Sequence, residues 1–208
     1  MRQIDMTGRA CPLPVVEAKK ALAPPETQGI VIKVDNKIAV QNLEKMASSR
    51  GYSLSFKEAD DGSFDVTIQK GPDFGEYENN SLSILKKSVM NGPGPIDKNL
   101  VVVIGSDTLG RGEEELGKIL MKSFIYSLSE LDIAPVAVIF MNRGAYLSAK
   151  GSNTVSDIKR LEEKGAEILT CGTCANYYNL TDSIEAGAIT DMYKITEIMA
   201  QARSVINI

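Results

Sequence analysis

The sequence predicts two α/β units: a small two-layer unit of four strands and two helices, and then a mostly parallel sheet with helices on both faces. Three observations carry this prediction. Strand-like and helix-like hydrophobic periodicities follow one another as βαβαββ over residues 1–70. Residues 71–98 are interrupted by glycine, proline and asparagine, which is typical of a linker. Over residues 99–208, apolar strands alternate with amphipathic helices.

The composition and net charge of the chain exclude some classes of partner. Of 208 residues, 43% are apolar and 24% are charged, as in ordinary globular proteins. The net charge of −4 provides no basic surface, so neither nucleic acid nor a membrane is expected as a partner. The start of the chain lacks an apolar signal segment, and no apolar run approaches the ~20 residues of a membrane span. We therefore expect a cytoplasmic protein.

The chain has three cysteines and no histidine. Without imidazole, Ser-His-Asp and Cys-His catalysis are excluded, as is every zinc site that needs histidine. An odd number of cysteines without a secretion signal does not suit a structural disulfide framework. Chemistry is left to thiols, carboxylates, lysines and the backbone, and we expect neither a cofactor nor a metal.

In the first unit, apolar residues recur every three to four positions over Pro12–Leu22 and Val40–Arg50, which predicts two helices. β-Branched and alternating segments predict strands, and the turn at residues 60–62 joins the last two as a hairpin. The four predicted strands are Ile4–Met6, Ile30–Val34, Ser53–Ala59 and Ser63–Lys70. With both helices on one face of the sheet, the unit closes.

Cys11 precedes Pro12, the residue that opens the first helix. Because a residue before proline avoids the α region, we predict Cys11 to be the N-cap. Its sulfur would then face the helix dipole and the free N–H groups of Leu13 and Val15, since prolines 12 and 14 have none. This placement favours a nucleophilic thiolate.

The residues around this cysteine read Asp5-Met6-x-Gly8-x-x-Cys11-Pro12-x-Pro14, followed by the helix to Leu22. This pattern resembles the signature of the TusA-like (SirA-type) sulfur-carrier domain, and the resemblance covers residues 1–70. It implies that Cys11 accepts a persulfide sulfur from a donor and passes it on. The linker that follows, 71–98, includes a short amphipathic segment, Ser81–Val89, that predicts a helix.

The second unit is predicted as a flavodoxin-like open sheet, because its strands are apolar throughout and separated by helices. The predicted strands are Leu100–Ile104, Val136–Met141, Glu167–Thr170, Ala188–Thr190 and Val205–Ile208. The predicted helices are Glu113–Leu131, Val155–Lys164 and Met192–Ala202. Ligands bind such sheets at the carboxyl ends of the strands. Three loops should gather there: 105–112, 142–151 and the one that carries Cys171.

Cys171 and Cys174 follow a strand as Cys-Gly-Thr-Cys and would share one face of a helical start. This spacing allows a disulfide and a lowered pKa of one thiol. Two alternatives stay open. The pair is half of a zinc site completed by carboxylates or a second protomer, or the two cysteines are inert.

Other polar residues at this edge have simpler interpretations. The loop 105–112 is not a P-loop; it is a plain turn or an anion site contacted by Arg111. Arg143 covers the crevice or is a solvated arginine in a turn. We expect Tyr177 and Tyr178 to have a packing role. The three glutamates 113–115 should form the exposed start of a helix, where they complement its dipole.

The second half resembles the DsrE-like fold, and the whole arrangement resembles the selenium-metabolism family called YedF. The residues that carry this are the Cys171–Cys174 pair and the segment Ala188-Ile189-Thr190-Asp191-Met192-Tyr193. The resemblance implies sulfur or selenium trafficking without naming a reaction. Our leading hypothesis is a carrier or transferase in which Cys11 takes sulfur or selenium as a persulfide or perselenide, and Cys171 and Cys174 receive it or reduce it by forming a disulfide. The resemblance also implies a cysteine desulfurase-like donor protein, an acceptor protein and a homo-oligomer. Two other hypotheses are a non-catalytic adaptor of a sulfur relay and a thiol–disulfide oxidoreductase.

Overall fold

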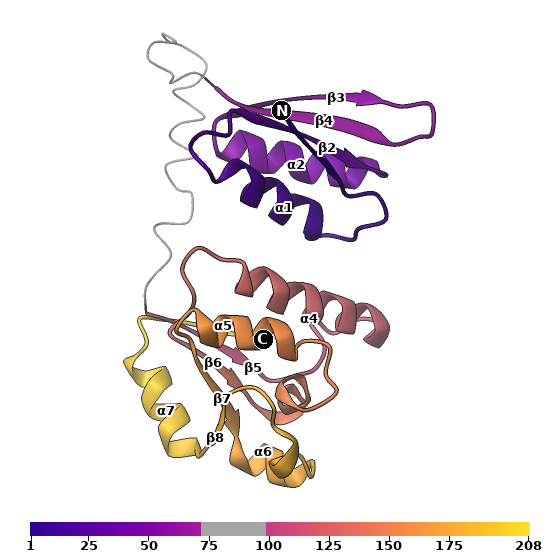
Figure 1. Ribbon diagram of the computed structural model, residues 1–208. Coiled ribbons are helices and arrows are strands. Elements are labelled where there is room, and N and C mark those ends of the chain that lie inside the picture. The colour runs from indigo at the N-terminus through magenta and orange to yellow at the C-terminus, as the bar shows by residue number, and fades with distance from the viewer. Residues whose placement is uncertain (72–98) are drawn as a thin grey trace. The chain divides into compact units, whose positions relative to one another are not determined.

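The computed structural model describes residues 1–71 and 99–208, which form two compact units (Figure 1). Each unit is described by itself. The predicted helix Ser81–Val89 lies outside the described residues. Across the described parts of the chain, no helix has both the length and the apolar composition needed to cross a membrane.

The first unit is a four-stranded sheet with both helices on one face (Figure 1). Its elements are β1 (Arg2–Asp5), α1 (Leu13–Leu22), β2 (Gly29–Val34), α2 (Lys37–Ser49), β3 (Tyr52–Glu58) and β4 (Phe64–Lys70). The strand order is β1-β2-β4-β3, in which β1 is parallel to β2 and the other pairs are antiparallel. The predicted βαβαββ order is confirmed.

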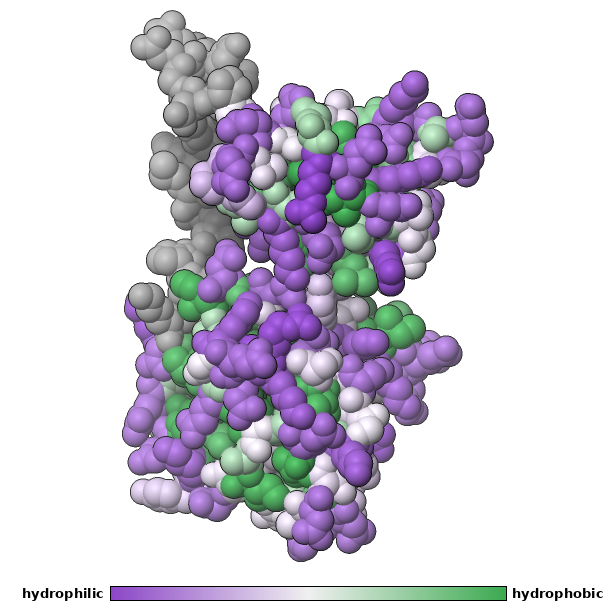
Figure 2. Space-filling view, in the orientation of Figure 1, coloured by the Kyte–Doolittle hydropathy of each residue, from purple (hydrophilic) through white to green (hydrophobic). Residues whose placement is uncertain are grey.

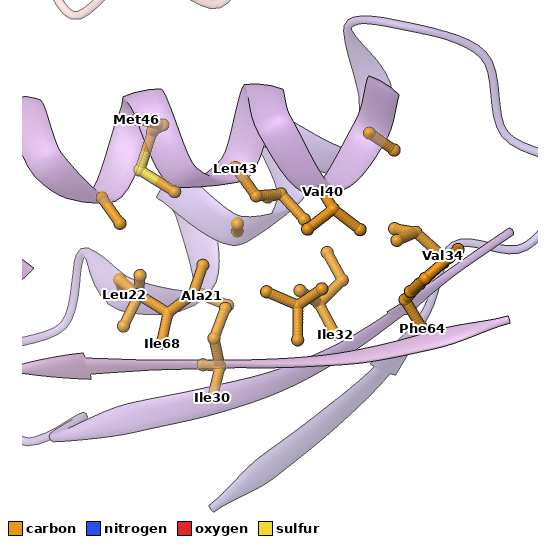
Figure 3. Packing of buried hydrophobic residues seen from close by; sticks show 14 residues of the cluster. Ala21, Leu22, Ile30, Ile32, Val34, Val40, Leu43, Met46, Phe64 and Ile68 are labelled. Atoms are coloured by element: carbon orange, nitrogen blue, oxygen red, sulfur yellow. The ribbon is translucent and has the colours of Figure 1, made fainter. Parts of the chain in front are cut away.

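The core of this unit lies between the helices and the sheet. In Figure 3, Leu22 of α1 and Leu43 of α2 point toward the apolar side chains of β2 and β4. Ile30, Ile32 and Ile68 are fully buried there. Removing such a side chain from water stabilises the fold by about 2 kcal/mol, so this layer fixes the helices on the sheet.

The second unit is an all-parallel five-stranded sheet in the order β8-β7-β6-β5-β9. Its strands are β5 (Leu100–Ile104), β6 (Ala137–Phe140), β7 (Glu167–Cys171), β8 (Ala188–Thr190) and β9 (Ser204–Asn207). Its helices are α4 (Glu114–Ser129), α5 (Val155–Glu163), α6 (Gly172–Tyr177) and α7 (Met192–Gln201), with short 3-10 turns η1 (Asn142–Ser148) and η2 (Thr181–Ser183). The predicted α/β class with a parallel sheet is confirmed.

Helices cover both faces of this sheet, as predicted. On β5, Val102 and Ile104 pack into one core with α4 and α5, while Val101 and Val103 pack into a second core with Ile195 of α7. Figure 2 shows mainly hydrophilic residues on the visible surface of both units, with hydrophobic ones scattered among them. Among the described residues, buried apolar side chains form one cluster in the first unit and two in the second.

Three helix starts differ from the prediction, and α4 differs by one residue, since it begins at Glu114 with Glu113 as its N-cap residue. Helix α2 begins at Lys37 rather than Val40, because the Asn36 side chain accepts a hydrogen bond from the Ala39 N–H (2.8 Å) and caps the helix. Helix α1 begins at Leu13, with Pro12 as its N-cap residue. The difference at α1 bears directly on Cys11.

Candidate thiol sites

The loop that carries Cys11 is fixed by two carboxylates at the ends of β1 and β2. Asp5 accepts hydrogen bonds from the N–H (2.9 Å) and hydroxyl (2.8 Å) of Thr7. Asp35 accepts one from the N–H of Gly8 (2.5 Å). Gly8 has φ +70°, where a side chain would be strained. These hydrogen bonds lower the pKa of each carboxyl, so both anchors are charged at neutral pH.

Cys11 itself is exposed and is joined to Pro12 by a cis peptide bond. It borders a small cavity of about 60 Å³ between the start of α1 and the first turns of α2, where Ile38 and Asn42 lie. The Asn42 side-chain amide is 4.0 Å from the Cys11 sulfur, a long contact. The sulfur is therefore accessible and has an amide donor within reach.

The prediction that Cys11 is the N-cap is wrong. The N-cap residue is Pro12, and the two N–H groups expected to face the sulfur are engaged elsewhere. The Leu13 N–H donates to the Ala10 carbonyl (3.0 Å), and the Val15 N–H donates to the Pro12 carbonyl (3.1 Å). The start of α1 thus uses both of these N–H groups within its own backbone, and Cys11 is exposed on a fixed loop.

The other two cysteines lie at the carboxyl end of β7. Cys171 ends the strand and is only 1% exposed, whereas Cys174 lies in α6 and is half-buried. The two thiols lie near each other, and the Asn142 N–H donates to the Cys174 sulfur (3.0 Å). Burial raises the pKa of the Cys174 thiol, and the Asn142 N–H acts in the opposite direction.

Three strand-end loops meet at this edge, as predicted. Arg143, after β6, binds Asp107, after β5, through two parallel hydrogen bonds of 2.8 Å each. These bonds hold the pKa of the Asp107 carboxyl below its ordinary value. Arg143 is thus not a freely solvated turn residue, since it ties two loops together.

A tyrosine cluster lies beside the thiols. The Tyr178 hydroxyl donates to the Asn142 side-chain oxygen (2.6 Å), and the Tyr178 ring centroid lies 5.1 Å from that of Tyr146. Tyr177 also contacts Tyr178 (5.0 Å) but is 78% exposed. The expected packing role therefore applies to Tyr178 and not to Tyr177.

A larger cavity of about 560 Å³ opens at the same edge. Asp107 and Tyr146 line it, together with three lysines, Lys118, Lys122 and Lys150. Arg111, the anion contact suggested by the sequence, is exposed and does not line this cavity. The expected exposed helix start at residues 113–115 is observed, with Glu114 paired to Lys118 (2.7 Å). Within the described ranges, no three acidic or cysteine side chains gather as metal ligands.

Comparisons with known proteins divide the chain in two. Residues 2–70 match the model of the family "Sulfurtransferase TusA", and residues 112–208 match the DsrE/DsrF-like family. A candidate sulfur carrier protein of Methanocaldococcus jannaschii is 34% identical over 71 residues, which are 34% of this chain and 95% of the relative. The chain belongs to the TusA sulfur-carrier family. It is a TusA-like domain fused to a DsrE-like domain.

Further relatives match single domains. A candidate sulfur carrier protein of Escherichia coli, TsuB, is 28% identical over 72 residues, which are 34% of this chain and 96% of the relative. The SirA-like protein of Desulfitobacterium hafniense is 46% identical and covers 35% of this chain and 100% of its own, with a TM-score of 0.33. The ychN protein of E. coli is 13% identical, and the match covers 53% of this chain and 99% of its own, with a TM-score of 0.43. Both TM-scores are below 0.5, and the strand orders given above define the two folds.

Sequence reasoning located the three cysteines but missed the polar residues that contact them. In the TusA-like domain the missed residue is Asn42, a mid-helix amide without a local signal. In the DsrE-like domain it is Asn142, which has φ +46°. Asparagine tolerates this region better than most residues, so an asparagine directly after an apolar strand was the available signal.

Proposed function

We propose that this protein is a sulfur or selenium carrier and transferase, in which Cys11 holds the atom as a persulfide or perselenide. The Cys171–Cys174 pair receives the atom or reduces it. The donor is a cysteine desulfurase-like protein, and an acceptor protein takes the product. Membership in a sulfur-carrier family supports the relay role, while the cargo, the partners and the residue roles are the proposal.

The observation that carries this proposal is the exposed Cys11 thiol on a loop fixed by Asp5 and Asp35. A carrier must present its sulfur to two different proteins in turn, which requires an accessible atom at a defined position. The small cavity beside Cys11 leaves room for the one atom that is added. An inert cysteine would be buried among apolar side chains instead.

The transfer steps balance as thiol–persulfide exchange. The Cys11 thiolate attacks the outer sulfur of the donor persulfide, and the donor thiolate leaves. Cys174 then takes the outer sulfur in the same way, and the Cys11 thiolate is regenerated. Attack by Cys171 on the Cys174 sulfur releases hydrosulfide and forms a disulfide, so two thiols are oxidised and one sulfur is reduced. A dithiol reductant restores the pair.

The test is to incubate the reduced full chain with a cysteine desulfurase and cysteine and to map added mass by peptide mass spectrometry. We expect one sulfur atom on Cys11. The Cys11→Ser variant should lose loading, while the double variant Cys171→Ser/Cys174→Ser should keep it on Cys11. Loading on no cysteine with a working donor, or unchanged loading in Cys11→Ser, would contradict the proposal. Selenocysteine in place of cysteine tests the cargo, because it gives the donor a perselenide whose selenium can be transferred by the same exchange.

A second candidate function is a thiol–disulfide oxidoreductase centred on the pair. The proximity of the Cys171 and Cys174 thiols favours it, because a Cys-x-x-Cys pair can form a disulfide. In that case the Cys11→Ser variant reduces a small disulfide as fast as the unmodified chain. Sulfur loading on Cys11 in the first experiment separates the two functions.

A further inference from the structure

The two thiols of the pair differ in access. Cys171 is buried at the end of β7, and Cys174 is half-buried in α6. A reagent from solvent therefore meets Cys174 first, and Cys171, buried beside it, can react in a second step. Buried thiols in apolar surroundings react slowly, so the difference in burial sets an order of reaction.

A closed ring of contacts holds the Cys174 sulfur. Asn142 directs its N–H at the sulfur (3.0 Å), and its side-chain oxygen accepts the Tyr178 hydroxyl (2.6 Å). The Tyr178 N–H in turn donates to the Cys174 carbonyl (3.0 Å). The positive φ of Asn142 is an uncommon backbone state, which persists where surrounding contacts fix it. The ring thus couples the tyrosine hydroxyl to the position of the backbone donor.

The surroundings of the Cys174 sulfur make the Asn142 N–H important for the pKa of this thiol. Cys174 packs against an apolar cluster that includes Leu169 and Ile195. The ionisable groups linked to it are the Cys171 thiol and, through Asn142, the Tyr178 hydroxyl. Arg143, the residue after Asn142, is paired with Asp107. Burial disfavours a thiolate here, and the Asn142 N–H is the donor that opposes this penalty.

We propose that Cys174 is the attacking thiol of the pair, that Cys171 is the resolving thiol, and that Asn142, held by Tyr178, positions the Cys174 sulfur. The Cys174 thiolate attacks a disulfide and expels one thiolate, forming a mixed disulfide. Cys171 then attacks the Cys174 sulfur, expels the second thiolate and closes the Cys171–Cys174 disulfide. The substrate disulfide is reduced and the pair is oxidised. The inference extends the proposed function, but it concerns the dithiol alone.

The test uses 2,2′-dithiodipyridine as the probe, with no relay protein, on the full chain carrying Cys11→Ser. Release of pyridinethione is followed by stopped-flow absorbance. Adding Cys171→Ser should leave a fast first release, abolish the second and trap a mixed disulfide on Cys174. Adding Cys174→Ser should slow the first release by about tenfold or more, because only the buried thiol remains. A mixed disulfide trapped on Cys171 while Cys174 is present would overturn the assignment.

The positioning role has its own readout. In the same Cys11→Ser chain, Tyr178→Phe should slow the first release at neutral pH about threefold, the effect of one hydrogen bond. It should also move the midpoint of the pH–rate profile upward and leave the plateau at high pH unchanged. Tyr177→Phe is the matched control, because it removes the hydroxyl of a neighbouring, exposed tyrosine that contacts the same ring. Its pH–rate profile should match that of the parent chain. Superposed profiles for the two variants would overturn the role of the hydroxyl.

A double-mutant cycle separates positioning from general damage. Asn142→Gly keeps the positive φ and the N–H but removes the side-chain oxygen, so it should repeat the Tyr178→Phe shift. Combining the two should add no further shift, because both remove the same hydrogen bond. Additive shifts would contradict the coupled ring. Failure of sulfur loading on Cys11 would leave every one of these outcomes intact, so the two proposals fail independently.

Discussion

The TusA-like and DsrE-like domains present their thiols in opposite ways. Cys11 is exposed on a loop whose anchors, Asp5 and Asp35, hold the backbone and leave the sulfur accessible. Cys171 and Cys174 lie at the end of a buried strand, and polar contacts reach the Cys174 sulfur directly. The first arrangement suits a thiol that visits other proteins. The second suits a thiol pair whose reaction is completed within one domain.

This difference between the two thiol sites shows which contacts position the sulfur in each domain. In the TusA-like domain the fold fixes the loop, and the Leu13 and Val15 N–H groups donate to backbone carbonyls. In the DsrE-like domain the fold fixes a donor on the sulfur, through Asn142 and Tyr178. Substitutions can therefore be chosen that damage one thiol site and spare the other.

The largest expected effect comes from the core of the TusA-like domain. Leu43 is fully buried between α2 and the sheet, so Leu43→Ala should lower the free energy of unfolding of this domain by about 2–5 kcal/mol. Denaturant titration should show one transition displaced and the other unchanged. Dithiol reactivity toward 2,2′-dithiodipyridine should stay at the parental rate in the Cys11→Ser background. Loss of that reactivity would show that the domains do not behave separately.

The corresponding experiment in the DsrE-like domain changes Gly144 in η1. A Cβ there would overlap the Ile104 carbonyl at the end of β5, so Gly144→Ala forces the loop away from the sheet. We expect a loss of about 1–3 kcal/mol in the DsrE-like domain, as for other overpacked sites, and slower reaction of Cys174. Sulfur loading on Cys11 should be unchanged. An unaltered Cys174 rate would mean that this loop does not position the thiol.

The smallest effect concerns the Asp107–Arg143 pair, and it depends on pH. The folded-state pKa of Asp107 is lowered, so folding is favoured above the unfolded-state pKa of about 4, and this contribution is lost as pH falls through the folded-state value. Asp107→Asn should therefore cost at most about 1 kcal/mol at pH 7, because the arginine is partly exposed. Unfolding free energies at pH 7 and in acid give the comparison. A cost that grows on acidification would contradict this sign.

Much of the fold could be predicted because local patterns decide it. Period-two and period-3.6 apolar spacing gave the βαβαββ order, and continuous apolar strands gave a sheet covered on both faces. The order of the strands was less accessible. That β9 pairs with β5 depends on the path of the chain through α7, which no local pattern encodes.

The candidate site was predictable in part. Cys11, Cys171 and Cys174 were chosen from their spacing and neighbours, and the structure brings the last two into contact. The error at Cys11 arose because a pre-proline residue was equated with the N-cap, whereas Pro12 takes that position. Asn142 and Tyr178 were missed as contacts because each lies more than 30 positions from its partner, so only the folded chain shows the pairing.

The most direct test of the central claim follows sulfur after loading. Cys11 is loaded by a cysteine desulfurase, the donor and cysteine are removed, and peptides are mapped over time. The account predicts that sulfur leaves Cys11 while a Cys174 persulfide, or hydrosulfide with a Cys171–Cys174 disulfide, appears. In Cys174→Ser the sulfur should remain on Cys11. Sulfur that stays on Cys11 in the intact chain, or leaves equally fast without Cys174, would contradict transfer between the two thiol sites.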